Sequence, residues 1–186
     1  MKADIRIGWT VVALLMAVAL CMALSALVHA APRSLTDNLV AVQSSLQSRS
    51  EEPVDARELA DAITSVTHSP QWAALLLTTA HHESALSARI ARSEYKPHEG
   101  DHGKAWGLFQ NWKSASNANV WGSPDIAVQV KAASHLTRQY YNMCRNSGVP
   151  FPLSTMRALS GRGCSMPLKG EAQRMHTYQS VLARLQ

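Results

Sequence analysis

The sequence predicts a mainly α-helical domain, and three observations support this fold class. Apolar residues recur at spacings of three and four, helix-capping residues stand directly ahead of these runs, and neither strand alternation nor a βαβ rhythm is evident. With 186 residues, of which 46% are apolar and 17% charged, the chain is typical of a globular protein and too apolar for a disordered one. We therefore expect one helical domain with a single core.

Four long helices follow from caps and apolar spacing. Asp55 and Glu58 have the spacing of a capping box at the start of the first helix. Ser69 and Pro70 are the cap and first residue of the second, and Asp125 precedes the third. The last helix carries its apolar residues on one stripe. The expected ranges are 55 to about 66, 70 to about 84, 126 to about 148, and about 171 to 185.

The N-terminal segment, residues 1–30, has the pattern of an export signal. Lys2 and Arg6 precede an uncharged apolar run over residues 9–28, and a small-residue cleavage pattern ends at Ala30. This run is also long enough for an uncleaved membrane anchor. In both cases the remaining chain is expected outside the cytoplasm, in the periplasm or cell envelope. Residues 31–54 are rich in Ser and Gln and lack a strong packing face, so they are interpreted as a tether, with part of it open to a helical structure, ahead of a domain over 55–186.

Charge and cysteine content agree with an exported protein. The formal charge is +5, and removing Lys2, Arg6 and Asp4 with the leader lowers it to +4. This charge suits an acidic polymer, but Lys and Arg are scattered without a basic patch, so nucleic-acid binding is not expected. Cys144 and Cys164 are expected to form a disulfide in an oxidising compartment, with two buried thiols as the alternative.

A carboxylate ends the apolar stripe of the second helix. The stripe comprises positions 72, 75, 76, 79, 80 and 83, so Glu83 comes within about 20° of Trp72 on the helix surface. Burial disfavours the ionised carboxylate and makes such a group a proton donor near neutral pH. The general acid of glycosidic bond cleavage needs this property. A Glu at a helix end, satisfied by a Lys or a backbone amide, is the alternative.

Two segments around this carboxylate resemble motifs of the lytic transglycosylase (SLT-like) and goose-type lysozyme superfamily. They read AHHESAL over residues 80–86 and GLFQ over 107–110. The segment 158–163 and the last helix occupy the places of later family motifs, so that the resemblance covers roughly residues 60–185. It implies a lysozyme-like catalytic domain that cleaves peptidoglycan between N-acetylmuramic acid and N-acetylglucosamine.

The resemblance assigns roles to individual residues. Glu83 would be the general acid, and Ser84 and Gln110 would line the site. The family's Tyr and Asn are replaced by Leu159 and Ser160, which puts part of the mechanism in doubt.

Three aromatic residues are further candidates for substrate binding. Tyr140 or Tyr141 would supply the hydroxyl that the departure from the family pattern removes, the alternative being that no residue supplies it. Trp106 would stack on a sugar face, with a role as a packing anchor as the alternative.

A second carboxylate separates hydrolysis from transglycosylation. Asp101 stands where the goose-type pattern places a base that holds water for an inverting hydrolase, although a turn residue in a Gly-rich loop is an equal alternative. A lytic transglycosylase needs no such base, because the C6 hydroxyl of the substrate attacks. Animal-type lysozymes place an Asp at the position of Ala105, so cleavage through a carboxylate there is not expected. Transglycosylation is the favoured interpretation.

Other function classes have weaker support. Residues 98–102 match the zinc-peptidase motif HExxH, but that motif requires a helix, which Pro97 and Gly100 disfavour. No metal and no cofactor are therefore expected. A non-catalytic wall-binding or secretion scaffold is disfavoured by Glu83. The expected partners are peptidoglycan glycan strands, a secretion, conjugation or phage assembly, and the inner membrane if the leader stays uncleaved.

Overall fold

The chain divides into two compact units, residues 1–34 and residues 35–186. The computed structural model describes residues 16–18, 33–47, 52–95, 104–112 and 121–186. The predicted leader over residues 1–30 therefore lies almost wholly outside the described residues. Within the described ranges, no helix has the length and apolar character needed to cross a membrane.

The second unit is mainly helical, as the sequence predicts. Among its described residues, the strands form one short antiparallel pair, in which Ala105 faces Trp112 and Trp106 faces Asn111. The helices are α2 (Leu35–Leu46), α3 (Ala56–Val66), α4 (Pro70–Ser84), α5 (Ala88–Ala91), α7 (Ile126–Cys144), α8 (Leu153–Leu159) and α9 (Glu171–Leu185), and the strands are β1 (Ala105–Trp106) and β2 (Asn111–Trp112).

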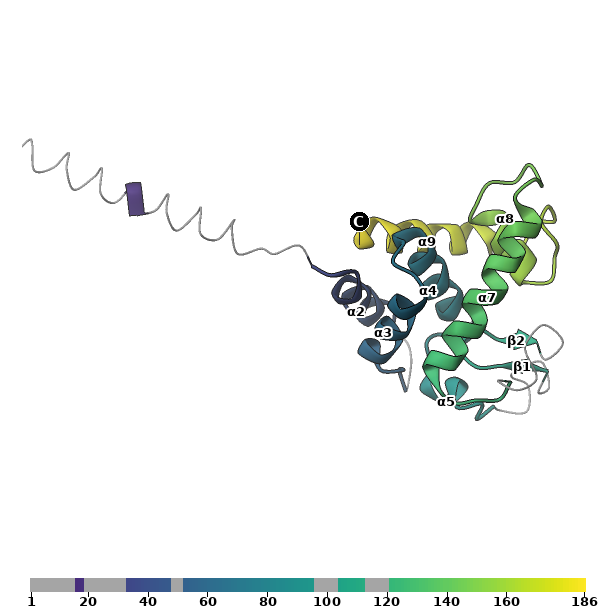
Figure 1. Ribbon diagram of the computed structural model, residues 1–186, viewed down its shortest axis with the longest axis horizontal. Coiled ribbons are helices and arrows are strands. Elements are labelled where there is room, and N and C mark those ends of the chain that lie inside the picture. Colours follow the sequence, from purple (N-terminus) through teal and green to yellow (C-terminus); the bar gives the residue numbers. More distant parts are fainter. Residues whose placement is uncertain (1–15, 19–32, 48–51, 96–103, 113–120) are drawn as a thin grey trace, which may run out of the picture. The chain divides into compact units, whose positions relative to one another are not determined.

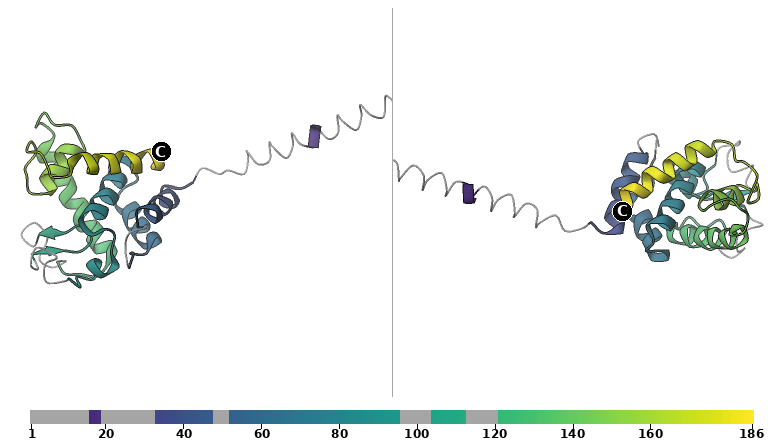
Figure 2. Two further views of the ribbon diagram at one scale, coloured as in Figure 1. Left: turned by 180° about the vertical axis from the view of Figure 1, so that it is seen from behind. Right: turned by 90° about the horizontal axis from the view of Figure 1, so that it is seen from above.

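Helix α4 is the centre of this domain. It lies between α3, α7 and α9 (Figure 1), and Figure 2 shows the same arrangement from behind and from above. Almost every face of α4 is apolar and buried, as expected for a helix that is surrounded by others. The residues of the predicted apolar stripe differ in burial. Leu75, Leu76 and Ala80 are buried, whereas Trp72 and Glu83 are half-buried.

The predicted helix starts are confirmed, with differences in detail. The side chains of Asp55 and Asp125 each accept a hydrogen bond from the backbone N–H three residues later, at 2.8 and 3.1 Å. Ser69 precedes α4, but its hydroxyl bonds to Gln71 at 2.8 Å and does not cap the helix. Helix α7 ends at Cys144, four residues before the expected end at 148.

The interpretation of residues 31–54 as a tether is wrong for α2. Leu39 and Val42 are buried in the main core, and Gln43 is fully buried with its side-chain amide 3.4 Å from the carbonyl oxygen of Val54. The apolar positions 35, 39, 42 and 46 have helical spacing, which gives α2 a packing face among its Ser and Gln residues. The compact unit accordingly begins at residue 35.

Candidate active site

The polypeptide turns sharply directly after Glu83. Ala85 and Leu86 both have positive φ angles, 52° and 58°, a conformation that costs non-glycine residues about 1 to 3 kcal/mol. The backbone N–H of Ala85 donates to His81 O at 2.9 Å, which closes the end of α4. Leu86 is fully buried, so its apolar side chain compensates part of this cost.

Two further contacts fix this turn. The hydroxyl of Ser84 donates to Ala80 O at 2.7 Å and accepts from the N–H of Leu86 at 3.2 Å. The chain then pairs with the segment before α3, where Val54 N–H donates to Leu86 O and Ala88 N–H donates to Glu52 O, both at 2.8 Å. Ser84, predicted to line the site, is buried and serves to close the helix in this structure.

Glu83 forms an ion pair with Arg174, which lies 91 positions later in the sequence. Its Oε1 lies 2.6 Å from the Nη1 of Arg174, in the first turns of α9. The two side chains are 27% and 20% exposed, so the pair is partly shielded from water. The expectation that Glu83 is buried among apolar side chains is not met, because its carboxylate is half-buried and paired with a guanidinium.

Two histidines, His81 and His82, directly precede Glu83 in the sequence. Burial lowers the pKa of His82 to about 4, and the charge of Arg174 and the neighbouring His81 add to this effect. His82 is therefore neutral at pH 7, and its Nε2 lies 3.0 Å from the hydroxyl of Thr177 on α9. The ring centroids of His81 and His82 are 5.1 Å apart. Helices α4 and α9 thus meet through an ion pair and a neutral hydrogen bond.

The GLFQ segment is the turn of the β1–β2 hairpin. Gly107 has φ +68°, and a Cβ at this position would overlap the Oε1 of Gln129. Glycine alone combines easy access to a positive φ angle with the absence of a Cβ atom, and this position requires both. Gln110, also at positive φ (46°), folds its side chain back so that Nε2 donates to Gly107 O at 2.8 Å. The predicted site residue Gln110 is half-buried at the end of this turn.

Two residues without a predicted role hold the turn in place. Gln129 of α7 is 1% exposed; its Oε1 accepts from Leu108 N–H at 2.8 Å, and its Nε2 donates to Ala91 O at 2.7 Å. The hydroxyl of Tyr95 accepts from Gly107 N–H at 2.7 Å. The amphipathic pattern of α7 places position 129 on the buried face, which is the one sequence signal that could have singled out this glutamine.

The aromatic candidates lie in different surroundings. Trp106 is 1% exposed and its Nε1 donates to Ser123 O at 3.1 Å, which fits the packing alternative. Tyr141 packs edge-on against Trp72, with ring centroids 5.4 Å apart, near the start of α4 and not at its Glu83 end. Tyr140 is half-buried on α7.

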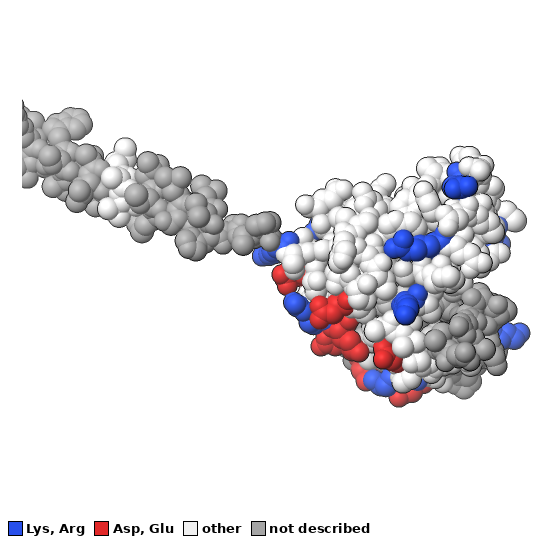
Figure 3. Space-filling view, viewed as in Figure 1, with Lys and Arg blue, Asp and Glu red and all other residues white. Residues whose placement is uncertain are grey.

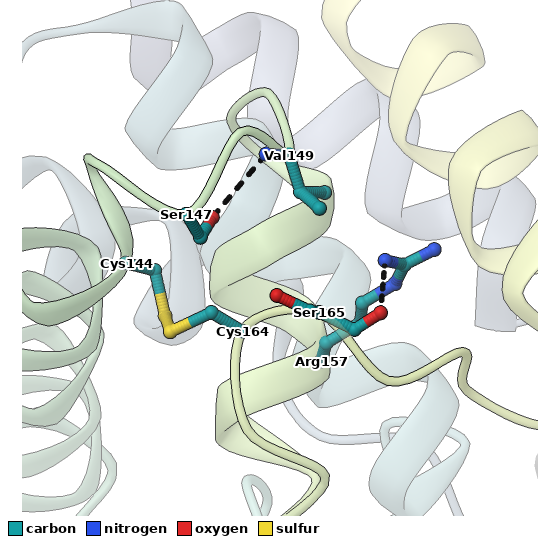
Figure 4. Close-up of a disulfide and its surroundings, with 6 residues drawn as sticks. All are labelled: Cys144, Ser147, Val149, Arg157, Cys164 and Ser165. Carbon is teal, nitrogen blue, oxygen red and sulfur yellow. Dashed lines mark hydrogen bonds between the residues drawn. A yellow bond between two sulfur atoms is a disulfide. The ribbon is translucent and has the colours of Figure 1, made fainter.

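The predicted disulfide is present, with the Cα atoms of Cys144 and Cys164 5.3 Å apart (Figure 4). It joins the end of α7 to the loop between α8 and α9. Arg157 supports the same loop, because its Nη1 donates to Ser165 O at 2.9 Å and its Nε and Nη2 bind Glu171 at 2.7 and 2.8 Å. This bidentate contact holds the pKa of Glu171 below its usual value.

The surface charge is uneven. Residues 126–186 contain eight Lys or Arg residues and one acidic residue, Glu171. On the face shown in Figure 3, acidic side chains gather over α2 and α3, whereas the area over α7 and α8 shows basic ones. Residues 126–186 therefore carry a net positive charge.

Asp101 and the HExxH segment over residues 98–102 lie outside the described residues. Within the described ranges, no three His, Cys, Asp or Glu residues come together in a way that could hold a metal ion. A comparison of the chain with models of known protein families, with curated proteins and with solved structures found no match in any of the three.

Proposed function

We propose that this protein is a lytic transglycosylase that cleaves the β-1,4 bond between N-acetylmuramic acid and N-acetylglucosamine in peptidoglycan, with Glu83 as the general acid. The observation that carries the proposal is the position of Glu83. Its half-buried carboxylate lies in the last turn of the central helix, directly before a backbone turn that is strained at two residues. Strained backbone of this kind is concentrated at functional sites.

The second motif supports the proposal independently. Gly107 to Gln110 form a tight turn whose glycine is irreplaceable and whose backbone is held by Gln129 and Tyr95. A loop fixed this firmly is a suitable wall for a sugar-binding site, because rigid groups lose little entropy when a ligand binds. The net positive charge of residues 126–186 also suits an anionic wall polymer.

The proposed reaction uses one carboxyl group twice. Glu83 protonates the glycosidic oxygen as the bond to C1 of the muramyl sugar breaks. The C6 hydroxyl of the same sugar then attacks C1, and its proton passes to the Glu83 carboxylate. The products are a free 4-hydroxyl on one fragment and a 1,6-anhydro end on the other. An inverting hydrolase that uses Asp101 as base is the competing proposal, and it yields reducing ends.

The cellular location that we propose is based on the predicted leader over residues 1–30. We place the enzyme outside the cytoplasm, in the periplasm or cell envelope, either released or held at the inner membrane. Peptidoglycan glycan strands are its substrate, and a secretion, conjugation or phage assembly is a candidate partner.

Replacement of Glu83 by Gln tests the proposal, since the amide fills the same space and cannot donate a proton. We expect cleavage of purified sacculi to fall by about 10² to 10⁴. Glu58→Gln is the matched control, because Glu58 is an exposed carboxylate on α3 and should leave activity unchanged. Near-normal activity of Glu83→Gln would refute the assignment.

Mass analysis of the released muropeptides distinguishes the two reaction types. We expect 1,6-anhydro ends and little effect of Asp101→Asn. Reducing ends from the wild type, together with inactivity of Asp101→Asn, would establish the hydrolase instead.

A further inference from the structure

Four hydrogen bonds in series connect the end of helix α4 to the GLFQ turn. Ser87 N–H donates to Ser84 O at 3.1 Å, and Ala91 N–H donates to Ser87 O at 3.0 Å. The Nε2 of Gln129 then donates to Ala91 O at 2.7 Å, and its Oε1 accepts from Leu108 N–H at 2.8 Å. Because Ser84 directly follows the proposed general acid and Leu108 lies within the turn, the series joins the two motifs.

Gln129 contributes the one side chain in this series. The other links are bonds between backbone groups of the turn after α4 and of the short helix α5. Gln129 comes instead from α7, is 1% exposed, and is bonded at both ends of its amide, since its Nε2 also donates to Ser123 O at 3.0 Å. A buried amide held in this way fixes the separation between α5 and the turn.

Tyr95 makes a second connection between the same two segments. It follows the end of α5 by four residues, and its hydroxyl accepts from Gly107 N–H at 2.7 Å. The Nε2 of Gln110 lies 3.4 Å from the same hydroxyl. The first two residues of the turn are therefore held by two side chains that are distant from each other in the sequence.

We propose that Gln129 and Tyr95 are positioning residues for the reaction, because they set the placement of the GLFQ turn relative to Glu83. This inference rests on the proposed function and deepens it. The turn holds the glycan strand while Glu83 protonates the glycosidic oxygen, so their alignment depends on the hydrogen bonds that join the two segments. A displacement of about 1 Å at a reacting group costs about a hundredfold in rate.

The first test measures kcat and KM of the full chain on soluble, peptide-free glycan strands of peptidoglycan. Gln129→Leu keeps the residues of the turn but removes their connection to α5. We expect kcat to fall by about tenfold to a hundredfold and KM to change by less than about threefold, since the binding groups are kept and their alignment with the acid is lost.

Tyr95→Phe is a milder variant of the same connection. It should show the same division between kcat and KM with a smaller fall in kcat, because Tyr95 is half-buried and water replaces the lost hydroxyl group as a partner of the turn. This variant also decides the question if Gln129→Leu does not fold.

Leu39→Ala is the matched control for loss of stability. Leu39 is 1% exposed in the core, and Figure 1 shows its helix α2 on the opposite side of the domain from β1 and β2. Its truncation should destabilise the fold to an extent similar to that of Gln129→Leu. All variants are compared under conditions in which each is folded, and Leu39→Ala should then keep the kcat and the KM of the wild type.

Amide hydrogen exchange reports the connection without any substrate. In Gln129→Leu, exchange of the Leu108 N–H should accelerate by at least about tenfold more than exchange of the Leu76 N–H. Leu76 is buried in the middle of α4, so its exchange follows unfolding of the whole domain. In Leu39→Ala both amides should accelerate by the same factor.

Three results would overturn the inference: a normal kcat in both Gln129→Leu and Tyr95→Phe, a rise of KM at unchanged kcat, or an equal fall of kcat in Leu39→Ala. If Glu83→Gln still abolishes cleavage of sacculi, these results refute the positioning role alone. The proposed function fails instead if the wild type releases no muropeptides. Exchange of the Leu108 N–H then still decides whether Gln129 joins the two segments.

Discussion

Gln129 offers the sharpest test of how this fold holds its candidate site. Replacing Gln129 by Leu keeps the side-chain volume similar but removes the groups that bond the hairpin turn and the end of α5. The N–H of Leu108 and the carbonyl of Ala91 lose a partner in a buried position, at about 1 to 3 kcal/mol each. Ser123 O also accepts from Gln129, but it keeps its bond from Trp106. We therefore expect a loss of about 2 to 6 kcal/mol.

Urea unfolding measures this loss directly. With a slope of about 2 kcal/mol per M for a domain of this size, the midpoint should fall by about 1 to 3 M while the slope stays constant. Gln139→Leu is the control, because Gln139 lies on the same helix in an exposed position and should shift stability by no more than about 0.5 kcal/mol. A free energy of unfolding for Gln129→Leu that matches this control would refute the claim that the turn depends on Gln129.

Two further predictions concern stability. Replacing both Cys144 and Cys164 by Ser should lower the free energy of unfolding by about 3 kcal/mol, because the bond closes a loop with a sequence separation of 20; unfolding curves of both proteins test this, and coincident curves would speak against it. Stability should also fall by about 1 to 3 kcal/mol between pH 6.5 and pH 4, since the pKa of folded His82 is about 4 and the unfolded chain binds a proton that the folded chain excludes. His82→Gln should reduce this fall, and an unchanged pH dependence in urea unfolding of the variant would contradict the explanation.

Local signals in the sequence were sufficient to predict α3, α4, α7 and α9. A capping Asp acts on the backbone three residues later, so Asp55 and Asp125 could be interpreted without knowledge of the fold. The disulfide followed from an even pair of cysteines and the expected compartment. The packing of α2 into the core was missed because its few apolar residues were judged by their number and not by their spacing.

The contacts that organise the candidate site could not be obtained in this way. Gln129 reaches the hairpin turn across 21 positions of sequence, and Arg174 reaches Glu83 across 91. No local pattern specifies such pairs, since they depend on how α7 and α9 pack around α4. Burial could not be predicted for Trp106 either, because its sequence position beside a Gly-rich loop does not reveal that the ring is buried.

The ion pair changes the physical argument for Glu83. A stripe of apolar residues that ends in a carboxylate suggests protonation by burial, and that argument treats the neighbouring helices as a uniform apolar medium. Helix α9 is not such a medium here, since its first turns present Arg174 to the carboxylate at 2.6 Å. The surroundings of the carboxylate are therefore set by two helices, and the residue pattern of α4 describes only one of them.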